Sequence, residues 1–256
     1  MTDEDLTDEE VVADYDVRSP ASRTFITVIG TIAAVAVIGG LVLGASVLMR
    51  DTTVSTSEIA AGDAAQIKID AGASDVRIVQ GDSDVIRVTA RITSGLRKTD
   101  FQIGRRADEI KIVADCQSWL NPGCGVETTL EIPQGFPVEI STSSGDVVAS
   151  KVVEGVLTII SASGDIDGTG LQVDELDATT RSGNISASFA TQPFAVKAAT
   201  TSGDIAADLP KGKRSYAVLT TSKSGEVSSG IESDPAGRGF VRATSRSGDI
   251  SLRTTK

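Results

Sequence analysis

The sequence predicts an all-β protein whose main part is a β-solenoid, preceded by one N-terminal transmembrane helix. Three observations predict this fold class. A short phrase returns six times in the second half of the chain, period-2 patterns of apolar residues run through the segment before it, and one uncharged apolar block lies near the N-terminus. A repeat of about 20 residues is typical of stacked supersecondary units, each of which buries its apolar face against its neighbours.

Residues 1–24 form an acidic tail. They contain eight acidic residues against Arg18 and Arg23, a net charge of −6. A segment so charged and so poor in apolar residues cannot offset the entropy cost of ordering, so we expect it to be disordered. Two interpretations stay open: a docking tail for a basic cytoplasmic protein, or a solvated acidic tail without a partner.

Residues 25–49 form an apolar block without a charged residue. At about 1.5 Å per residue, a helix of this length crosses the roughly 30 Å hydrocarbon core of a bilayer. A cleaved signal peptide is the alternative, but its apolar region is usually shorter, about 7 to 15 residues. Arg18 and Arg23 precede the block and Arg50 follows it, so the positive-inside rule places the N-terminus in the cytoplasm. We therefore expect a single-pass protein of the cell membrane, in contact with the lipid bilayer.

The rest of the chain is expected to lie outside the cytoplasm. Residues 50–64 are mostly small and polar, which predicts a spacer between the membrane and the folded part. Residues 65–256 are predicted to form the β-strand-repeat domain. Short segments with apolar residues at alternate positions, such as those around Ile67 and Ile86, are separated by clusters of Gly, Asp and Ser.

Cys116 and Cys124 are the two cysteines of the chain, and a turn-rich loop separates them. On the outer side of a membrane we expect them to form a disulfide. A zinc site is the alternative, but zinc usually takes four ligands, and the chain has no histidine and no further thiol. Trp119 lies in the same loop and is a possible anchor for a partner, or else a side chain that packs its own loop.

The repeated phrase is a Ser or Thr, any residue, Ser, Gly, an acidic residue or Asn, then Ile or Val. Its copies are residues 142–147, 161–166, 180–185, 200–205, 222–227 and 245–250. Their glycines are predicted to form structural corners with a positive φ or a tight turn: Gly145, Gly164, Gly183, Gly203, Gly225 and Gly248. The two Ser/Thr positions are expected on one face of a strand, because side chains alternate.

The acidic position after each glycine is expected to accept hydrogen bonds from nearby backbone amides, as in Asx turns. The last position is expected to point inward and to build one apolar ladder through successive copies: Val147, Ile166, Ile185, Ile205, Val227 and Ile250. A second phrase, [IL]-P-x-G, occurs at residues 132–135 and 209–212. Because proline cannot donate to a ladder, both prolines should lie at strand ends.

With its S-G-D-[IV] corners, [IL]-P-x-G phrases and one N-terminal span, the chain resembles the bacterial putative-adhesin family, a β-strand-repeat domain of unknown function. The resemblance covers about residues 65–256 and is most specific over residues 142–250. It implies a β-solenoid-like fold and a location in the cell envelope, and no established activity. Asn184 and Glu226 depart from the family's aspartate at the corner, which weakens a strict role for that aspartate.

Enzymatic activity is not expected, and we predict no catalytic, cofactor or metal residues. Asp146, Asp165, Asp204 and Asp249 could be imagined as a row of catalytic carboxylates, but one acid per repeat at a turn is what a structural role predicts. A calcium loop could begin at Asp165, yet its twelfth position is Leu176, where a bidentate Glu is needed. An ordinary turn is the favoured interpretation.

The favoured function class is a non-catalytic module that interacts with an envelope polymer or a surface protein. The alternative is a signalling protein whose outer domain senses the envelope while the acidic tail contacts a cytoplasmic partner. Residues 25–256 carry a net charge of −5, which argues against nucleic acid as a ligand because phosphate binding needs a basic face.

Overall fold

A computed structural model describes residues 51–94, 100–106, 109–115 and 124–255, together with the helical residues Val37, Gly40 and Gly44. The predicted tail (residues 1–24) lies outside the described residues, as does nearly all of the predicted span (residues 25–49). Within the described residues, no helix has the length and apolar character needed to cross a membrane. The folded unit that follows is described here by itself.

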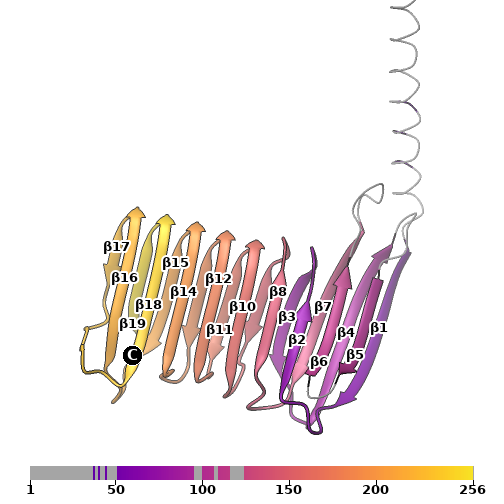
Figure 1. Ribbon diagram of the computed structural model, residues 1–256, viewed down its shortest axis with the longest axis horizontal. Helices are drawn as coiled ribbons and strands as arrows, with labels where there is room; N and C mark the ends of the chain where they lie inside the picture. Colours follow the sequence, from indigo (N-terminus) through magenta and orange to yellow (C-terminus); the bar gives the residue numbers. More distant parts are fainter. Residues whose placement is uncertain are drawn as a thin grey trace, which may run out of the picture. The chain divides into compact units, whose positions relative to one another are not determined.

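The described part of this unit consists of two β-sheets (Figure 1). Sheet A has ten strands: β1 (Asp51–Ala60), β3 (Asp75–Gln80), β4 (Val85–Ser94), β7 (Gly125–Ile132), β9 (Val147–Ser150), β11 (Ile166–Leu171), β13 (Ile185–Phe189), β15 (Ile205–Pro210), β17 (Val227–Ser229) and β19 (Ile250–Thr255). Sheet B has nine: β2 (Gln66–Asp70), β5 (Asp100–Arg106), β6 (Glu109–Asp115), β8 (Val138–Thr142), β10 (Val156–Ser163), β12 (Glu175–Ser182), β14 (Ala195–Ser202), β16 (Tyr216–Ser224) and β18 (Gly239–Ser247).

Each repeat forms one rung of a solenoid. The chain runs along a strand of sheet B, turns a short corner and returns along a strand of sheet A, as β10 and β11 do. Equivalent residues of successive rungs pair in parallel, so that Ile185 lies between Ile166 and Ile205. The sequence therefore predicts the fold class of this region correctly: it is all-β, with stacked parallel strands.

The core lies between the two sheets, because one apolar cluster takes side chains from both of them. Alternation along each strand turns every second side chain inward. The predicted ladder is confirmed at five positions, each at most 2% exposed: Val147, Ile166, Ile185, Ile205 and Ile250. It is wrong at Val227, which is 40% exposed. The two prolines of the [IL]-P-x-G phrase lie at strand ends as predicted, Pro133 directly after β7 and Pro210 as the last residue of β15.

The N-terminal end corrects the predicted spacer. Residues 51–60 form β1, which pairs antiparallel with β4 over its whole length, so this stretch belongs to the folded sheet. β4 pairs antiparallel with β7, and β5 pairs antiparallel with β6. The sequence concealed β1 because its inward positions are mostly small and polar, with Ser55 opposite Ala90 and Ser57 opposite Val88.

The C-terminal end corrects the expectation that the copies stack in sequence order. In sheet B, β18 lies between β14 and β16, and in sheet A, β19 lies between β15 and β17. The last copy of the phrase is thus inserted between the fourth and the fifth, as Figure 1 shows for the labelled strands. The rung formed by β16 and β17 becomes the end of the stack, which is why Val227 is exposed.

At both ends of the solenoid, the last strands have polar residues at some of their inward positions, beside apolar ones such as Ile59 and Val218. In the last rung Thr220 lies level with buried Ala243, and Ser229 lies level with buried Leu252. β1 provides the equivalent at the other end through Ser55 and Ser57. Terminal repeats of solenoids need such polar outer layers to remain soluble.

Candidate interaction surfaces

The six predicted glycines lie one above another in the corners between sheet B and sheet A. A Cβ atom at Gly183 would lie 2.2 Å from the carbonyl oxygen of Gly164, and one at Gly203 would lie 1.9 Å from that of Gly183. No real Cβ tolerates such distances, so the corners require glycine because the rungs approach closely. A positive φ contributes only in the last three rungs, at Gly203 (150°), Gly225 (156°) and Gly248 (146°). Of the two options expected for these glycines, a positive φ or a tight turn, the first does not apply to Gly145, Gly164 and Gly183.

The residue after each glycine links one rung to the next. The side-chain oxygen of Asp165 accepts a hydrogen bond from the Asn184 backbone N–H at 2.7 Å, and that of Asn184 accepts one from Asp204 at 2.9 Å. The same contact recurs along the stack, which in spatial order is Asp75, Asp146, Asp165, Asn184, Asp204, Asp249 and Glu226. The bonds run between rungs, and not within a local Asx turn as expected.

Asp75 extends this ladder beyond the six copies. Its carboxylate accepts from the Asp146 N–H at 2.9 Å. The sequence around it, Ala73-Ser74-Asp75-Val76, has the acid and the valine of the phrase, with Ser74 at the glycine position. This partial match to the phrase is the sequence feature from which Asp75 could have been predicted as a member of the ladder.

The leading Ser/Thr forms a second set of contacts between rungs in five of the six copies; the exception is Ser161, whose buried hydroxyl has no hydrogen-bond partner among the described residues. The buried Thr180 hydroxyl donates to the Gly164 carbonyl at 3.3 Å, and the buried Thr200 hydroxyl donates to that of Gly183 at 3.2 Å. The serine before glycine is exposed instead, as at Ser182 and Ser202. The two positions were expected on one face, but the corner starts at this serine and turns it outward.

These contacts bear on the chemistry considered from the sequence. Each acidic corner residue from Asp75 to Asp249 already uses one side-chain oxygen to hold the next rung. In the segment considered as a calcium loop, Asp167 accepts from the Thr169 hydroxyl at 2.9 Å, and Leu176 at the twelfth position is buried in the core, 3% exposed. The geometry favours an ordinary corner followed by a strand. Cys116 and Trp119 lie outside the described residues, so the disulfide with Cys124 and the partner anchor stay predictions.

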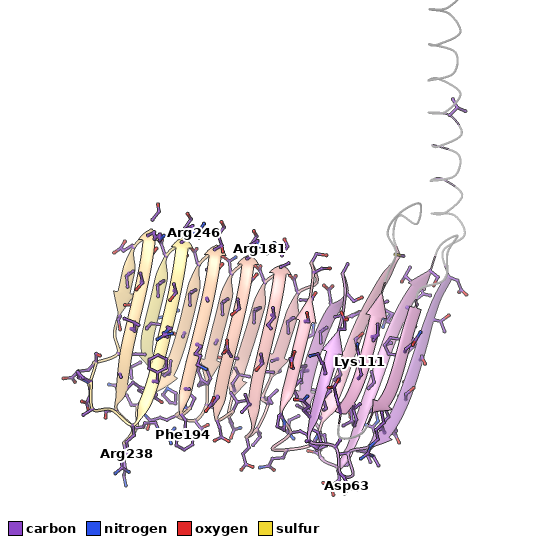
Figure 2. All side chains as sticks on the ribbon, in the orientation of Figure 1. Asp63, Lys111, Arg181, Phe194, Arg238 and Arg246 are labelled. Atoms are coloured by element: carbon purple, nitrogen blue, oxygen red, sulfur yellow. The ribbon has the colours of Figure 1, made fainter. Side chains whose placement is uncertain are left out.

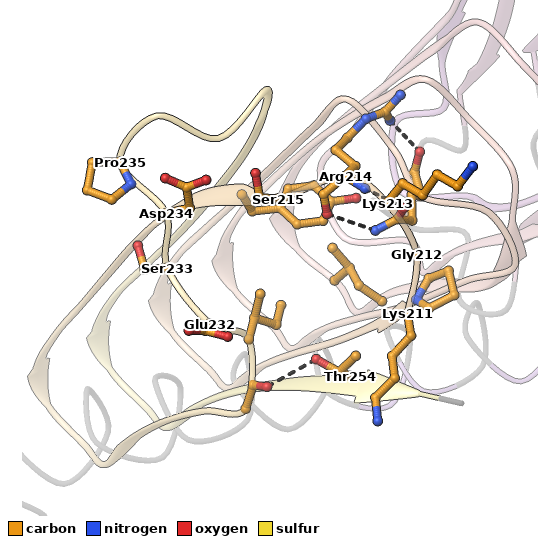
Figure 3. Close-up of a pocket in the computed structure, with 16 residues that line it drawn as sticks. Lys211, Gly212, Lys213, Arg214, Ser215, Glu232, Ser233, Asp234, Pro235 and Thr254 are labelled. Atoms are coloured by element: carbon orange, nitrogen blue, oxygen red, sulfur yellow. Dashed lines mark hydrogen bonds between the residues drawn. The ribbon is translucent and has the colours of Figure 1, made fainter.

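The inserted last copy creates a hollow at the foot of the C-terminal rungs (Figure 3). The loop between β15 and β16, residues 211–215, crosses the rung formed by β18 and β19 and leads to the last rung of the stack. Residues 230–238 then lead from that last rung back to β18, which lies between β14 and β16. Between these loops lies a pocket of about 790 Å³. Lys211, Lys213 and Glu232 line it and are exposed.

The wall of this pocket is held by Arg214 and Tyr216. The Arg214 backbone N–H donates to the Gln192 side chain at 2.9 Å, and its guanidinium lies 3.7 Å from the centre of the Phe194 ring. The buried Tyr216 hydroxyl donates to the Pro193 carbonyl at 3.0 Å. Burial raises the pKa of the Tyr216 phenol above its ordinary value, and the Arg214 charge offsets this only in part. These contacts are structural, and they leave the rim lysines as the free polar groups of the wall.

A second surface is the outer face of β12, β14, β18 and β16, here named the basic face. Its cations are Arg181, Lys197, Lys223, Arg242 and Arg246, all exposed. Lys197 lies 3.6 Å from Asp177, and the Arg242 guanidinium lies 5.2 Å from the centre of the Phe240 ring. Figure 2 shows Arg181 and Arg246 at the same edge of the sheet. This face was not predicted from the sequence, and its strand order, with β18 between β14 and β16, depends on the inserted rung.

Comparison with known proteins agrees with this architecture. Residues 127–253 match the family model described as Toastrack DUF4097. Comparison with curated proteins found no match. Among solved structures, the chain is similar to a putative cell adhesion protein from Clostridium sporogenes, with a TM-score of 0.50 and 11% identity over 80% of this chain and 100% of that chain. It is also similar to a putative adhesin from Bacteroides fragilis, with a TM-score of 0.44 and 12% identity over 79% of this chain and 97% of that chain. At 11% identity, the likeness to the Clostridium sporogenes protein is one of fold alone.

Proposed function

We propose that this chain, whose residues 127–253 match the Toastrack domain, is a single-pass membrane protein that presents a non-catalytic β-repeat module outside the cytoplasm. The module interacts with a polymer or a surface protein of the cell envelope. The uncharged block of residues 25–49 and the arginines before it support the anchor and its orientation. The name of the Clostridium sporogenes neighbour, a putative cell adhesion protein, agrees with such a role.

The observation that carries the interaction role is the closure of both solenoid ends. Polar inward residues at Ser55, Ser57, Thr220 and Ser229 make the end rungs poor surfaces for further stacking. The outer faces of the two sheets and the pocket between the C-terminal loops are then the surfaces that a partner meets. A solenoid whose two sheets expose their outer faces along the stack is suited to binding an extended partner.

Protease protection tests the topology. Protease is added to cells from which any outer barrier has been removed, and the fragments are probed with antibodies against the tail and against the C-terminal strands. We expect loss of the domain beyond residue 50 and protection of residues 1–24. A domain that survives in cells whose membrane is intact, but not after lysis, would overturn the outside placement.

The acidic tail, with its net charge of −6, favours signalling as a second candidate function. Co-purification with the full chain and with a chain lacking residues 1–24 separates the two. Loss of a cytoplasmic partner on deletion supports signalling. Unchanged envelope binding with no cytoplasmic partner supports the module alone.

A further inference from the structure

The basic face stands out because the chain as a whole is acidic. The net charge of the chain is −11, and that of the part beyond the acidic tail is −5. On the outer face of β12, β14, β18 and β16, five cations lie among two acids, Asp177 and Glu175. This face therefore carries a local excess of positive charge, over the C-terminal rungs of an otherwise acidic chain.

Most of these cations have no carboxylate of their own. Elsewhere on the sheets, Arg87 contacts Glu58 at 2.9 Å and Arg253 contacts Asp208 at 2.9 Å. Within the described residues, no ion pair includes Arg181, Lys223, Arg242 or Arg246. These four side chains are available to an external anion.

Strand register arranges the cations in two rows that run across the strands. Arg242 lies level with Lys197 in the first row. The second row consists of Arg181 on β12, Arg246 on β18 and Lys223 on β16. These three lie level because the residues directly before and after each of them are paired across the strands. At about 4.8 Å per strand the second row covers about 14 Å, and the offset of four residues from Arg242 to Arg246 separates the rows by about 13 Å.

Small side chains fill the strip between the two rows. They are Thr179, Ala199, Thr244 and Thr221, level with one another on β12, β14, β18 and β16. None rises far above the sheet, so an extended chain can lie between the rows and meet cations on both sides. The threonine hydroxyls can donate to its oxygens.

We propose that this strip binds a linear anionic polymer of the envelope, a glycan or polyol chain carrying regular phosphate or carboxylate groups, lying across the strands. This inference rests on the proposed envelope function and names the class of partner. Charges along such a polymer can meet cations on several neighbouring strands at once, since β12, β14, β18 and β16 each carry at least one. Release of counterions drives such binding, so its affinity should fall steeply with salt.

A labelled, synthetic glycerol-phosphate oligomer tests the proposal by fluorescence anisotropy with the full chain in neutral detergent micelles. We expect saturable binding at low salt, with a linear fall of log affinity against log salt concentration. The double variant Arg242→Gln/Arg246→Gln should bind about tenfold more weakly and show a shallower salt dependence. The matched control Arg77→Gln/Lys151→Gln removes the same charge from exposed positions outside the basic face, and should bind like the unmodified chain.

Three results would overturn the proposal: no binding at low salt, an equal loss in both double variants, or tighter binding of a single-stranded oligonucleotide of equal charge. The protease experiment separates this failure from failure of the proposed function. If the domain lies outside the cytoplasm but does not bind the oligomer, the proposed envelope module is kept and only the proposed polymer binding is refuted. If the domain lies inside the cytoplasm, both proposals are refuted.

Discussion

Three residue positions of the repeated corner hold neighbouring rungs together, each by a different contact. Glycine allows one rung to approach the carbonyl of the next, as Gly183 approaches Gly164. The acid accepts a backbone N–H of the following rung, and the leading hydroxyl donates back to a glycine carbonyl. The sequence identified these positions, since small, polar and acidic residues recur together. It did not reveal that the bonds join rungs, because a single copy reads like an ordinary turn.

Gly183→Ala tests the close approach. The added methyl group would overlap the Gly164 carbonyl, 2.2 Å away, and the backbone must shift to relieve it. We expect a loss of about 1 to 3 kcal/mol in the free energy of unfolding, measured by denaturant titration.

Gly104→Ala provides the matched control for Gly183→Ala, because nothing lies within 4 Å of a Cβ there. Its effect should stay within about 0.5 kcal/mol. Asp165→Asn should also be mild, since an amide oxygen still accepts and Asn184 already occupies this slot. Equal effects at Gly183 and Gly104 would refute the close approach, and a larger effect at Asp165 would require another role for the acid.

Tyr216 predicts a pH dependence of stability. Burial raises its folded-state pKa above the ordinary tyrosine value of about 10, so the folded chain keeps the phenol proton where the unfolded chain loses it. Its contribution is complete below about pH 10 and is lost as the pH rises through the folded-state pKa. The free energy of unfolding should therefore fall above about pH 10 more steeply in the unmodified chain than in Tyr216→Phe.

Absorbance titration at alkaline pH checks the assignment, since the chain has one other tyrosine, Tyr15 in the acidic tail. Tyr216→Phe should remove the component that titrates at higher pH. It should also cost about 1 kcal/mol at neutral pH, because the bond to the Pro193 carbonyl is lost. Identical pH profiles for the two chains would contradict the raised pKa.

At the scale of elements, the rung is the unit that repeats and the end rungs are modified forms of it. The sequence predicts the interior rungs well, because their inward positions are Val, Ile or Ala at a regular spacing. It fails at β1, where Ser55 and Ser57 replace the apolar inward residues, and the strand reads as a polar spacer. Polar inward residues protect an end rung from further stacking, and the same residues prevent its recognition as a strand in the sequence.

Converting the last rung into an interior-like rung should promote self-association. In Thr220→Val/Ser229→Val, two inward positions of β16 and β17 become apolar at an unpaired sheet edge. We expect dimers in sedimentation velocity at micromolar concentrations. The neighbouring outward pair, Thr221→Val/Ser228→Val, adds the same side chains to the faces and should remain in the original state. If both variants form dimers, the association is caused by added apolar surface in general and not by the inward positions of the last rung.

At the scale of the whole molecule, both candidate surfaces follow from one topological feature. The pocket exists because the loop of residues 211–215 passes over the position of β18 and β19. The order of the cations on the basic face follows from it too, because β18 places Arg242 and Arg246 between β14 and β16. Rung order depends on which rung can serve as the polar end, a comparison between distant segments that no local pattern contains. The candidate surfaces were therefore beyond sequence reasoning, although the repeat itself was not.

Disulfide trapping tests this rung order most directly. Ala199 and Thr244 are paired neighbours on β14 and β18, whereas Ala199 and Thr221 are two strands, or about 9.6 Å, apart. Disulfides need Cα atoms within about 7 Å. Under mild oxidation, Ala199→Cys/Thr244→Cys should form an intramolecular link, identified by peptide mass spectrometry, and Ala199→Cys/Thr221→Cys should not. The reverse pattern would mean that the copies stack in sequence order, and the account of the pocket and of the order of the cations on the basic face would have to be abandoned.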